Sequence, residues 1–312
     1  MKSYFYPGVE KKTINLFDNI VYSHVRDLEG NALELKLSVM VQNGNAEMRL
    51  AIGADDPKVD HTRKPALFFI PGGGWRGADK NLMLGEMSDF VNAGYAVVSV
   101  DYRNSSLGKW PCQIQDVKTA IRFIRANAEK YDIDPDNIGI FGRSAGGHLA
   151  AFAAMNLPGY DTEEYSEYSS EVQAAIDMFG PVDIGANMDM EMKKFSDPNF
   201  RWHRIEDTHG GALIGGDPVT IRERAEKASV TNFVNEKMVP MMMLHGDNDP
   251  IVPAEVSSEI LYKKIVEAGM EDRVSYYIIP HAGHGTREFF QYSTKALMIQ
   301  FFDGHLKKYY KN

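Results

Sequence analysis

The spacing of apolar residues at the start of the chain is typical of β structure. A half-buried antiparallel strand is predicted where apolar residues alternate with polar ones, at Leu33, Leu35, Leu37, Val39 and Val41. Residues 48–52 are expected to form its neighbour, with Asn43-Gly44 as the turn between the two strands. The first sixty residues are therefore expected to be mostly β structure.

Further along the chain, short runs are mostly apolar, as in strands buried on both faces. They are residues 66–70, 95–100, 138–141, 174–179, 239–245 and 274–279. Segments with helical character separate many of them, for example residues 82–93 and the segment after Trp110-Pro111, where Ile114, Val117 and Ile121 share one face. This alternation predicts an α/β fold with a mainly parallel, doubly wound sheet of about eight strands, flanked by helices.

Two segments interrupt the alternation of strands and helices. Residues 157–172 are polar, acidic and rich in tyrosine, and residues 183–217 scatter methionine, phenylalanine and tryptophan among polar residues. Long irregular insertions beside a ligand-binding edge are usually lids or binding loops. We therefore expect both segments to form a small cap, although packing alone would also explain any single aromatic residue there.

Composition narrows the class of protein. The 312 residues are 44% hydrophobic and 25% charged, without a linker-like stretch, which suits one domain over residues 1–312. The net charge of −9 and the lack of a basic run argue against nucleic acid or an anionic membrane as partner. No apolar run approaches the ~18 residues of a membrane span. A lone Cys112 suits a reducing compartment, so we expect a cytoplasmic protein, and a homo-oligomer is left open.

A Gly-x-Ser-x-Gly pentad follows the apolar run 138–141 and precedes a helix-forming segment. This order predicts strand, sharp turn and helix, with Ser144 at the apex. Gly142 and Gly146 lack the side chains that would collide with the neighbouring strand and helix. The pentad alone is weak support, because glycine and serine are common residues. Its position favours Ser144 as a nucleophile over an exposed serine in a glycine-rich turn.

A glycine-rich loop follows the predicted strand 66–70 and reads Pro71-Gly-Gly-Gly-Trp75. Consecutive glycines at the carboxyl end of a strand let backbone N–H groups approach a ligand. A phosphate-binding loop would need a Lys-Ser/Thr pair after the glycines, and none is present. An oxyanion hole, which binds the negative oxygen of a reaction intermediate, is the better interpretation. Trp75 is a candidate for substrate contact.

Two later loops carry the acid and base that a serine nucleophile needs. Asp247 and Asp249 follow the strand 239–245, while His281 and His284 follow the strand 274–279. A parallel sheet would bring both loops and Ser144 to one edge, in the order serine, aspartate, histidine. His148 and His245 are expected to be structural. No residue cluster has the spacing of a metal site, so we expect neither metal nor other cofactor.

These motifs together resemble the α/β-hydrolase superfamily and, within it, the bacterial esterase/lipase branch that includes hormone-sensitive-lipase-like esterases and carbohydrate acetyl and feruloyl esterases. The resemblance covers roughly residues 65–310. It implies Ser144 as nucleophile, Asp249 rather than Asp247 as the acid, and His284 rather than His281 as the base. It also implies an oxyanion hole formed by the backbone N–H groups of Gly73, Gly74 and Ala145. One departure is Pro71, where these esterases commonly carry a histidine that shapes the loop.

The expected function is a serine carboxylesterase that hydrolyses short-chain acyl esters. The cap and the absence of a long apolar lid favour an acetyl esterase acting on carbohydrate such as xylo-oligosaccharide, so the expected partner is a small-molecule or oligosaccharide ester. A general short-chain carboxylesterase and an arylformamidase-like hydrolase are alternatives. A prolyl-oligopeptidase-type peptidase lacks support, because no propeller-like repeats precede the domain. A non-catalytic binding protein on this fold would typically have lost one member of the Ser, Asp and His set.

Overall fold

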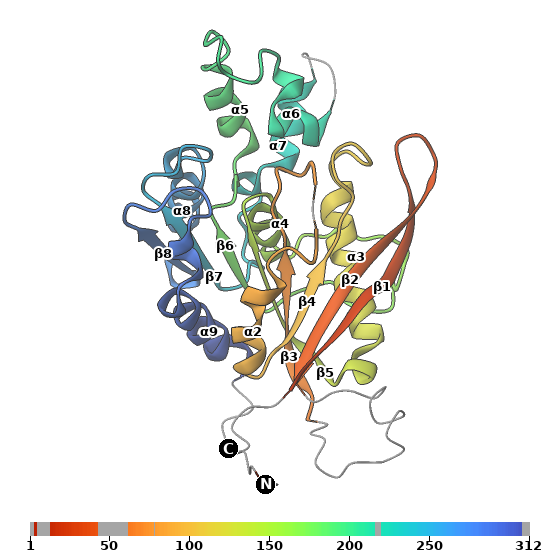
Figure 1. The fold of residues 1–312 in the computed structure, drawn as a ribbon. Coiled ribbons are helices and arrows are strands. Elements are labelled where there is room, and N and C mark those ends of the chain that lie inside the picture. Colours follow the sequence, from red (N-terminus) through yellow and green to blue (C-terminus); the bar gives the residue numbers. More distant parts are fainter. Residues whose placement is uncertain (1–2, 5–12, 43–61, 78, 216–219, 308–312) are drawn as a thin grey trace.

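A single sheet of eight strands organises the computed structural model, which describes residues 3–4, 13–42, 62–77, 79–215 and 220–307 (Figure 1). The strands are β1 (Ile14–Arg26), β2 (Ala32–Gln42), β3 (Lys64–Ile70), β4 (Ala96–Val100), β5 (Ile133–Arg143), β6 (Ala174–Met178), β7 (Met241–Gly246) and β8 (Val274–Ile279). Their order across the sheet is β1-β2-β4-β3-β5-β6-β7-β8. The β1–β2 and β2–β4 pairs are antiparallel, and the pairs from β4 through β8 are parallel. The predicted mainly parallel, doubly wound sheet is confirmed.

Helices cover both faces of this sheet. The α-helices are α2 (Leu84–Asn92), α3 (Cys112–Ala126), α4 (Ala145–Ala154), α5 (Ile184–Met192), α6 (His209–Ile214), α7 (Ile221–Ala228), α8 (Ser258–Glu267) and α9 (Tyr292–Leu306). Short 3₁₀ turns are η1 (Ala128–Tyr131), η2 (Ile205–Asp207), η3 (Val230–Asn232), η4 (Ala254–Val256), η5 (Glu271–Arg273) and η6 (Arg287–Phe290). One hydrophobic core holds residues of α3, α4 and α8, and a second core, on the other face, holds residues of α2 and α9.

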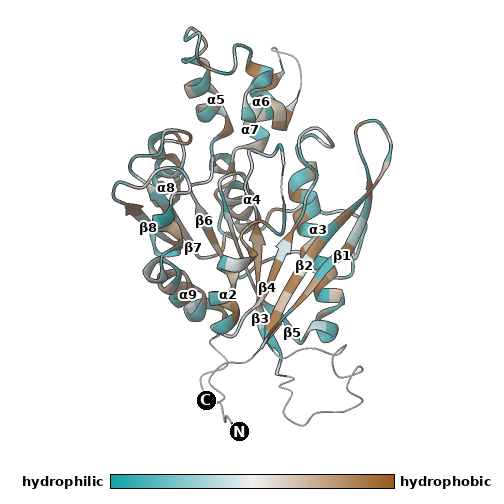
Figure 2. Cartoon of the chain, in the orientation of Figure 1, coloured by the Kyte–Doolittle hydropathy of each residue, from teal (hydrophilic) through white to brown (hydrophobic). Residues whose placement is uncertain are grey.

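The central strand β3 is apolar from Ala66 to Ile70 because both of its faces are buried. Phe68 and Ile70 belong to the core on the α3 and α4 face, whereas Leu67 and Phe69 belong to the core beneath α2 and α9. Side chains alternate between the two faces of a strand, so a strand covered on both sides is apolar at most of its positions. The strands are accordingly coloured as hydrophobic in Figure 2 over much of the sheet. Their carboxyl ends carry the loops described below.

The N-terminal region departs from the sequence prediction in one respect. β2 is antiparallel as predicted, but it is half-buried only over its first residues, because Ser38 and Met40 are buried as well as Leu37 and Val39. Met40 packs in the same core as Met87 of α2, which covers this face of the strand. The predicted strand at residues 48–52 and its turn at Asn43-Gly44 lie outside the described residues. Within the described residues, β2 is paired with β1 and β4.

The two segments predicted to form a cap lie in different places. α5, η2, α6 and α7 project beyond the sheet at the top of Figure 1. Residues 157–172 instead pack along α3, where Asp161 forms ion pairs with Lys118 and Arg122, and Tyr160 contacts Trp110. Lys118 and Arg122 are both buried, so this segment serves to neutralise charge on α3. Among the described residues, only the second segment therefore lies where a cap over the sheet would be.

Candidate active site

Ser144 occupies a sharp turn between β5 and α4, and its backbone has φ 54° and ψ −124°. Such a conformation is strained for a non-glycine residue and needs support from its surroundings. The flanking glycines allow the close packing. A Cβ on Gly142 would lie 2.2 Å from the carbonyl oxygen of Gly146, and a Cβ on Gly146 would lie 2.0 Å from the carbonyl oxygen of Ile70. Both distances are far below contact, so the turn can form only with glycine at these two positions.

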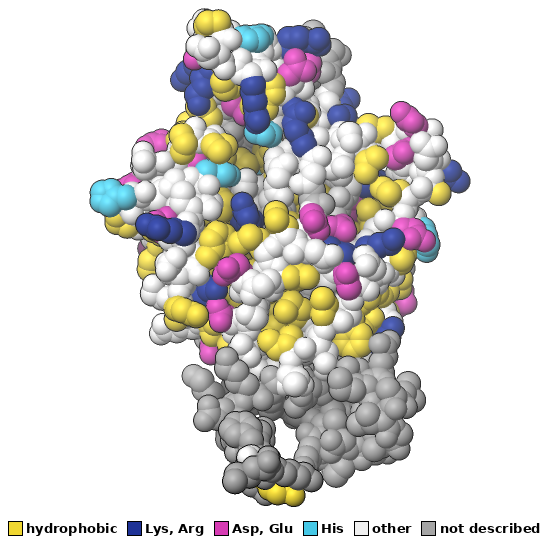
Figure 3. Space-filling view, viewed as in Figure 1, with side chains coloured by type: hydrophobic (Ala, Val, Ile, Leu, Met, Phe, Trp, Pro, Cys, Tyr) yellow, Lys and Arg dark blue, Asp and Glu magenta, His cyan; other side chains and the backbone are white. Residues whose placement is uncertain are grey.

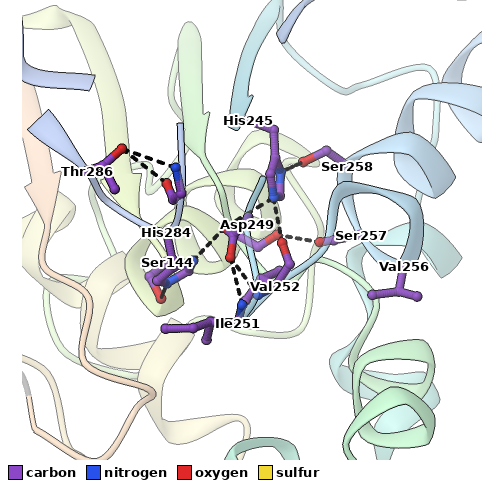
Figure 4. Close-up of polar contacts among 12 residues, drawn as sticks. Ser144, His245, Asp249, Ile251, Val252, Val256, Ser257, Ser258, His284 and Thr286 are labelled. Atoms are coloured by element: carbon purple, nitrogen blue, oxygen red, sulfur yellow. Dashed lines mark hydrogen bonds and ion pairs between the residues drawn. The ribbon is translucent and has the colours of Figure 1, made fainter. Parts of the chain in front are cut away.

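The structure brings Ser144, His284 and Asp249 into one hydrogen-bonded series (Figure 4). The Oγ of Ser144 lies 2.8 Å from Nε2 of His284, and Nδ1 of His284 lies 2.7 Å from Oδ2 of Asp249. A carboxylate oxygen only accepts, so the imidazole donates from Nδ1 and its Nε2 is free to accept the serine proton. This is the arrangement that a serine nucleophile requires.

The Asp249 carboxylate is fixed by its own loop as well as by His284. Its Oδ1 accepts hydrogen bonds of 2.9 Å from the backbone N–H groups of Ile251 and Val252. The buried His245 lies 3.6 Å from Oδ2 and donates to the carbonyl of Val252. Burial acts to raise the pKa of Asp249, but the polar contacts with His245 and His284 outweigh it and hold that pKa well below its usual range. The carboxylate is thus kept ionised beside His284.

The alternative acid and base candidates lie elsewhere. Asp247 accepts a hydrogen bond from the backbone N–H of His281, so it shapes the loop that carries the histidines. The His281 side chain is exposed and lies outside the cavity beside Ser144. Arg143, which lies beside the nucleophile, forms no ion pair with a carboxylate among the described residues. Its guanidinium lies 6.0 Å from the ring centroid of Phe290, and the residue lines the cavity.

The glycine-rich loop after β3 borders the nucleophile. Gly73 and Gly74 have φ values of 137° and 60°, a region that favours glycine. The loop is anchored even though Pro71 replaces the expected histidine, because the Tyr102 hydroxyl donates to the Pro71 carbonyl at 3.0 Å. Gly73, Gly74 and Ala145 all line the same cavity as Ser144. An oxyanion hole formed by their backbone N–H groups stays a prediction.

The cavity above Ser144 has a volume of about 440 Å³ and is closed by the second predicted cap segment. Ten of its 21 lining residues lie between positions 184 and 210, and none lies between 157 and 172. Trp75 also borders the cavity, but its side chain is 2% exposed and packs edge-on against His148. A substrate contact by Trp75 stays a prediction.

Three polar cap residues that the sequence analysis did not select line this cavity: Glu191, Arg201 and His209. Arg201 Nη2 lies 2.9 Å from Nε2 of His209, and Nδ1 of His209 lies 3.3 Å from Oε1 of Glu191. The sequence signal was weak, because the three residues follow no motif. The only local indication is Thr208, whose side chain accepts from Gly211 N–H and so caps the helix that begins at His209.

His148 lies behind the nucleophile, fully buried between Trp75 and Trp110. Its Nε2 donates to the carbonyl of Ala228 at 2.7 Å, and its Nδ1 has no hydrogen-bond partner within the described residues. The expectation of a structural histidine agrees with this position. Burial lowers the pKa of His148 to about 4 despite the bond to Ala228, so the ring is neutral in the folded protein.

This burial should make stability fall as the pH drops. Below pH 6.5 the unfolded chain protonates His148 while the folded chain does not until about pH 4, so unfolding becomes easier across that window. Substituting His148→Gln removes the effect. The stability advantage of the natural protein over the variant should shrink by about 2–3 kcal/mol between pH 7 and pH 4.5. Urea unfolding of both proteins at several pH values measures this, and a constant difference would contradict it.

Neither a membrane-spanning helix nor a metal-binding cluster is found in the part of the chain that the structure describes. No helix there is long and apolar enough to cross a membrane. No group of three or more His, Cys, Asp or Glu side chains is arranged to hold a metal ion within these ranges. The expectations of no cofactor and of a cytoplasmic location stay predictions.

Several known proteins are similar to this chain in sequence and in fold. The sequence profile of the BD-FAE family matches residues 55–265. Esterase LipC of Mycobacterium tuberculosis is 30% identical over 76% of this chain and 59% of its own length. Esterase LipQ of the same organism is 33% identical over 71% of this chain and 50% of its own length. The chain thus spans between half and three fifths of these two relatives.

A solved structure described as a truncated form of a carbohydrate esterase from gut microbiota has a similar fold. It superposes with a TM-score of 0.74 and 29% sequence identity, covering 97% of this chain and 99% of that one. The alignment therefore covers nearly all of both chains.

Proposed function

Because the chain belongs to the BD-FAE family, on the esterase branch of the α/β-hydrolases, we propose that it is a serine carboxylesterase that removes acetyl groups from carbohydrates such as xylo-oligosaccharides. The observation that carries the proposal is the hydrogen-bonded series of Ser144, His284 and Asp249, of which Ser144 and His284 line the cavity. A series in this geometry performs acyl transfer. The coarser activity, ester hydrolysis, draws further support from the two named esterase relatives.

The mechanism follows from the donors and acceptors in the site. His284 Nε2 takes the proton of Ser144 as the serine oxygen attacks the ester carbonyl. The backbone N–H groups of Gly73, Gly74 and Ala145 stabilise the negative oxygen that forms, and each such donor contributes about 2.7–4 kcal/mol. His284 then protonates the leaving alcohol and later activates water, which releases the acid and restores Ser144.

Cavity size and lining favour a small acyl group and a sugar alcohol. About 440 Å³ must hold both parts of the ester, which leaves little room for a long acyl chain. The aromatic ring of Phe200 lines the cavity and is a flat apolar surface of the kind on which pyranose rings stack, whereas the Trp202 ring is covered in part by the guanidinium of Arg201. Asn187 and Glu191 beside them can hydrogen-bond with hydroxyl groups.

Acetate release from acetylated xylo-oligosaccharides, measured beside hydrolysis of p-nitrophenyl acetate and p-nitrophenyl octanoate, tests the proposal. We expect release from both acetyl substrates, and a kcat/KM for the octanoate at least about tenfold lower than for the acetate, because the added methylenes do not fit. Hydrolysis of the aryl acetate alone would retain the esterase and reject the sugar. An aryl formamide cleaved in preference to every ester would instead favour the arylformamidase-like alternative.

A further inference from the structure

The cavity is basic although the protein is acidic. Its lining contains three cationic side chains, Arg143, Lys194 and Arg201, against one carboxylate, Glu191, whereas the whole chain has a net charge of −9. In Figure 3 dark blue side chains gather on the cap and border the hollow beneath it. An excess of positive charge in a cleft attracts anions. The positive charge of the cavity therefore indicates that its ligand carries an anionic group, a property that the acyl chemistry alone does not indicate.

The three cations have no carboxylate partner in the structure. Ion pairs within 4.0 Å among the described residues do not include Arg143, Lys194 or Arg201. Nearby Arg204, which does not line the cavity, is by contrast paired with Glu206. Lys194 and Arg201 are exposed residues that border the cavity, and Arg143 is partly buried, so the unpaired charge of the first two is accessible to a ligand that enters from solvent.

Arg201 is also held in position. Its guanidinium lies 3.8 Å from the ring centroid of Trp202, and its Nη2 lies 2.9 Å from Nε2 of His209. A guanidinium only donates, so Nε2 of His209 accepts and the ring proton lies on Nδ1, facing Glu191 at 3.3 Å. One of the five N–H groups of Arg201 is used in this way, and others are left to form a paired contact with a carboxylate.

The held guanidinium lies close to the reacting centre. His209 packs directly on the glycine-rich loop, because a Cβ on Gly74 would lie 2.4 Å from Cδ2 of the histidine. Arg201 is thus separated from Gly74 by one imidazole ring and one hydrogen bond. Arg201 and Ser144 line the same cavity, so a carboxylate bound to Arg201 can belong to the same molecule as the ester that reaches Ser144.

We propose that the site selects short-chain esters whose alcohol carries a carboxylate, such as acetylated sugars bearing a uronate group, and that Arg201 binds this carboxylate with the help of Lys194. This inference rests on the proposed esterase activity and names its substrate class more closely. His209 and Trp202 act as positioning residues for Arg201, and Glu191 fixes the tautomer of His209.

The test compares two acetyl esters that differ in charge, 4-acetoxybenzoate and its methyl ester. Substituting Arg201→Gln should lower kcat/KM for the anionic ester by about tenfold or more, mainly through KM, because a charge-assisted contact is lost. Hydrolysis of the neutral ester should change less than about twofold. Arg201→Lys should restore part of the preference, and Arg204→Gln, the matched control outside the cavity, should leave both rates unchanged.

Sugar substrates then separate a uronate from any other carboxylate. Acetylated xylo-oligosaccharides with glucuronate branches should lose more activity in Arg201→Gln than unbranched ones, and 0.5 M salt should reduce that preference by screening. Equal losses on the anionic and neutral substrates, or no loss on the anionic one, would overturn the inference. Hydrolysis of the neutral aryl ester by the natural protein reports separately on the proposed function. Its absence, together with absence of activity on every sugar ester, would reject that function itself.

Discussion

Substituting Ser144→Ala should lower kcat for ester hydrolysis on the order of a millionfold. In the proposed mechanism the Oγ of Ser144 attacks the ester carbonyl, and His284 has no serine proton to take when that oxygen is gone. The residual rate would come from the oxyanion donors and substrate binding alone. Steady-state kinetics with p-nitrophenyl acetate measure the change.

A covalent probe makes this prediction specific to one serine. A fluorophosphonate should label the natural protein once, on Ser144, and should not label the variant, as mass spectrometry of the digested protein will show. Ser106→Ala, a substitution in an exposed loop, is the matched control and should retain both labelling and activity. Turnover within a hundredfold of the natural protein in Ser144→Ala would refute the assigned nucleophile.

The parallel part of the sheet could be predicted from sequence because the burial of each strand is visible in the residues of that strand alone. A strand buried on both faces is mostly apolar, as β3 is from Ala66 to Ile70, and this pattern can be recognised without knowledge of the neighbouring strands. The turn at Ser144 is equally local, since Gly142 and Gly146 are required by contacts within a few residues and with the adjacent strand. Asp249 and His284 could be placed because parallel strands end at one edge of the sheet.

The remaining features depend on contacts between distant segments. His209 of the cap packs on Gly74 in the loop after β3. Neither residue's type or position in the sequence indicates that the two are in contact. Residues 157–172 look like a cap by composition, yet they are held on α3 by Asp161 and its two basic partners. The far face of β2 is buried by α2, so its alternation of polar and apolar residues underestimates its burial. Periodicity reports on one segment at a time and cannot supply these pairings.

The choice between Asp247 and Asp249 shows what the geometry of the structure adds to a sequence motif that contains two candidate acids. Both aspartates follow β7, two residues apart, and the sequence offered only a family resemblance to separate them. The carboxylate of Asp249 faces His284 Nδ1 at 2.7 Å, whereas that of Asp247 accepts from the backbone N–H of His281. Only the first contact can influence the proton on the imidazole ring.

Substituting Asp249→Asn should therefore lower kcat by about 10⁴-fold, while Asp247→Asn, its matched control, should change kcat by less than about tenfold. An amide at position 249 can donate to Nδ1 of His284, which moves the ring proton to Nε2 and prevents it from accepting the proton of Ser144. The loop should survive, because an amide oxygen can still accept from Ile251 and Val252. Kinetics of both variants, with thermal unfolding to verify folding, measure the contrast. A larger loss in Asp247→Asn than in Asp249→Asn would show that the carboxylate which orients His284 had been misassigned.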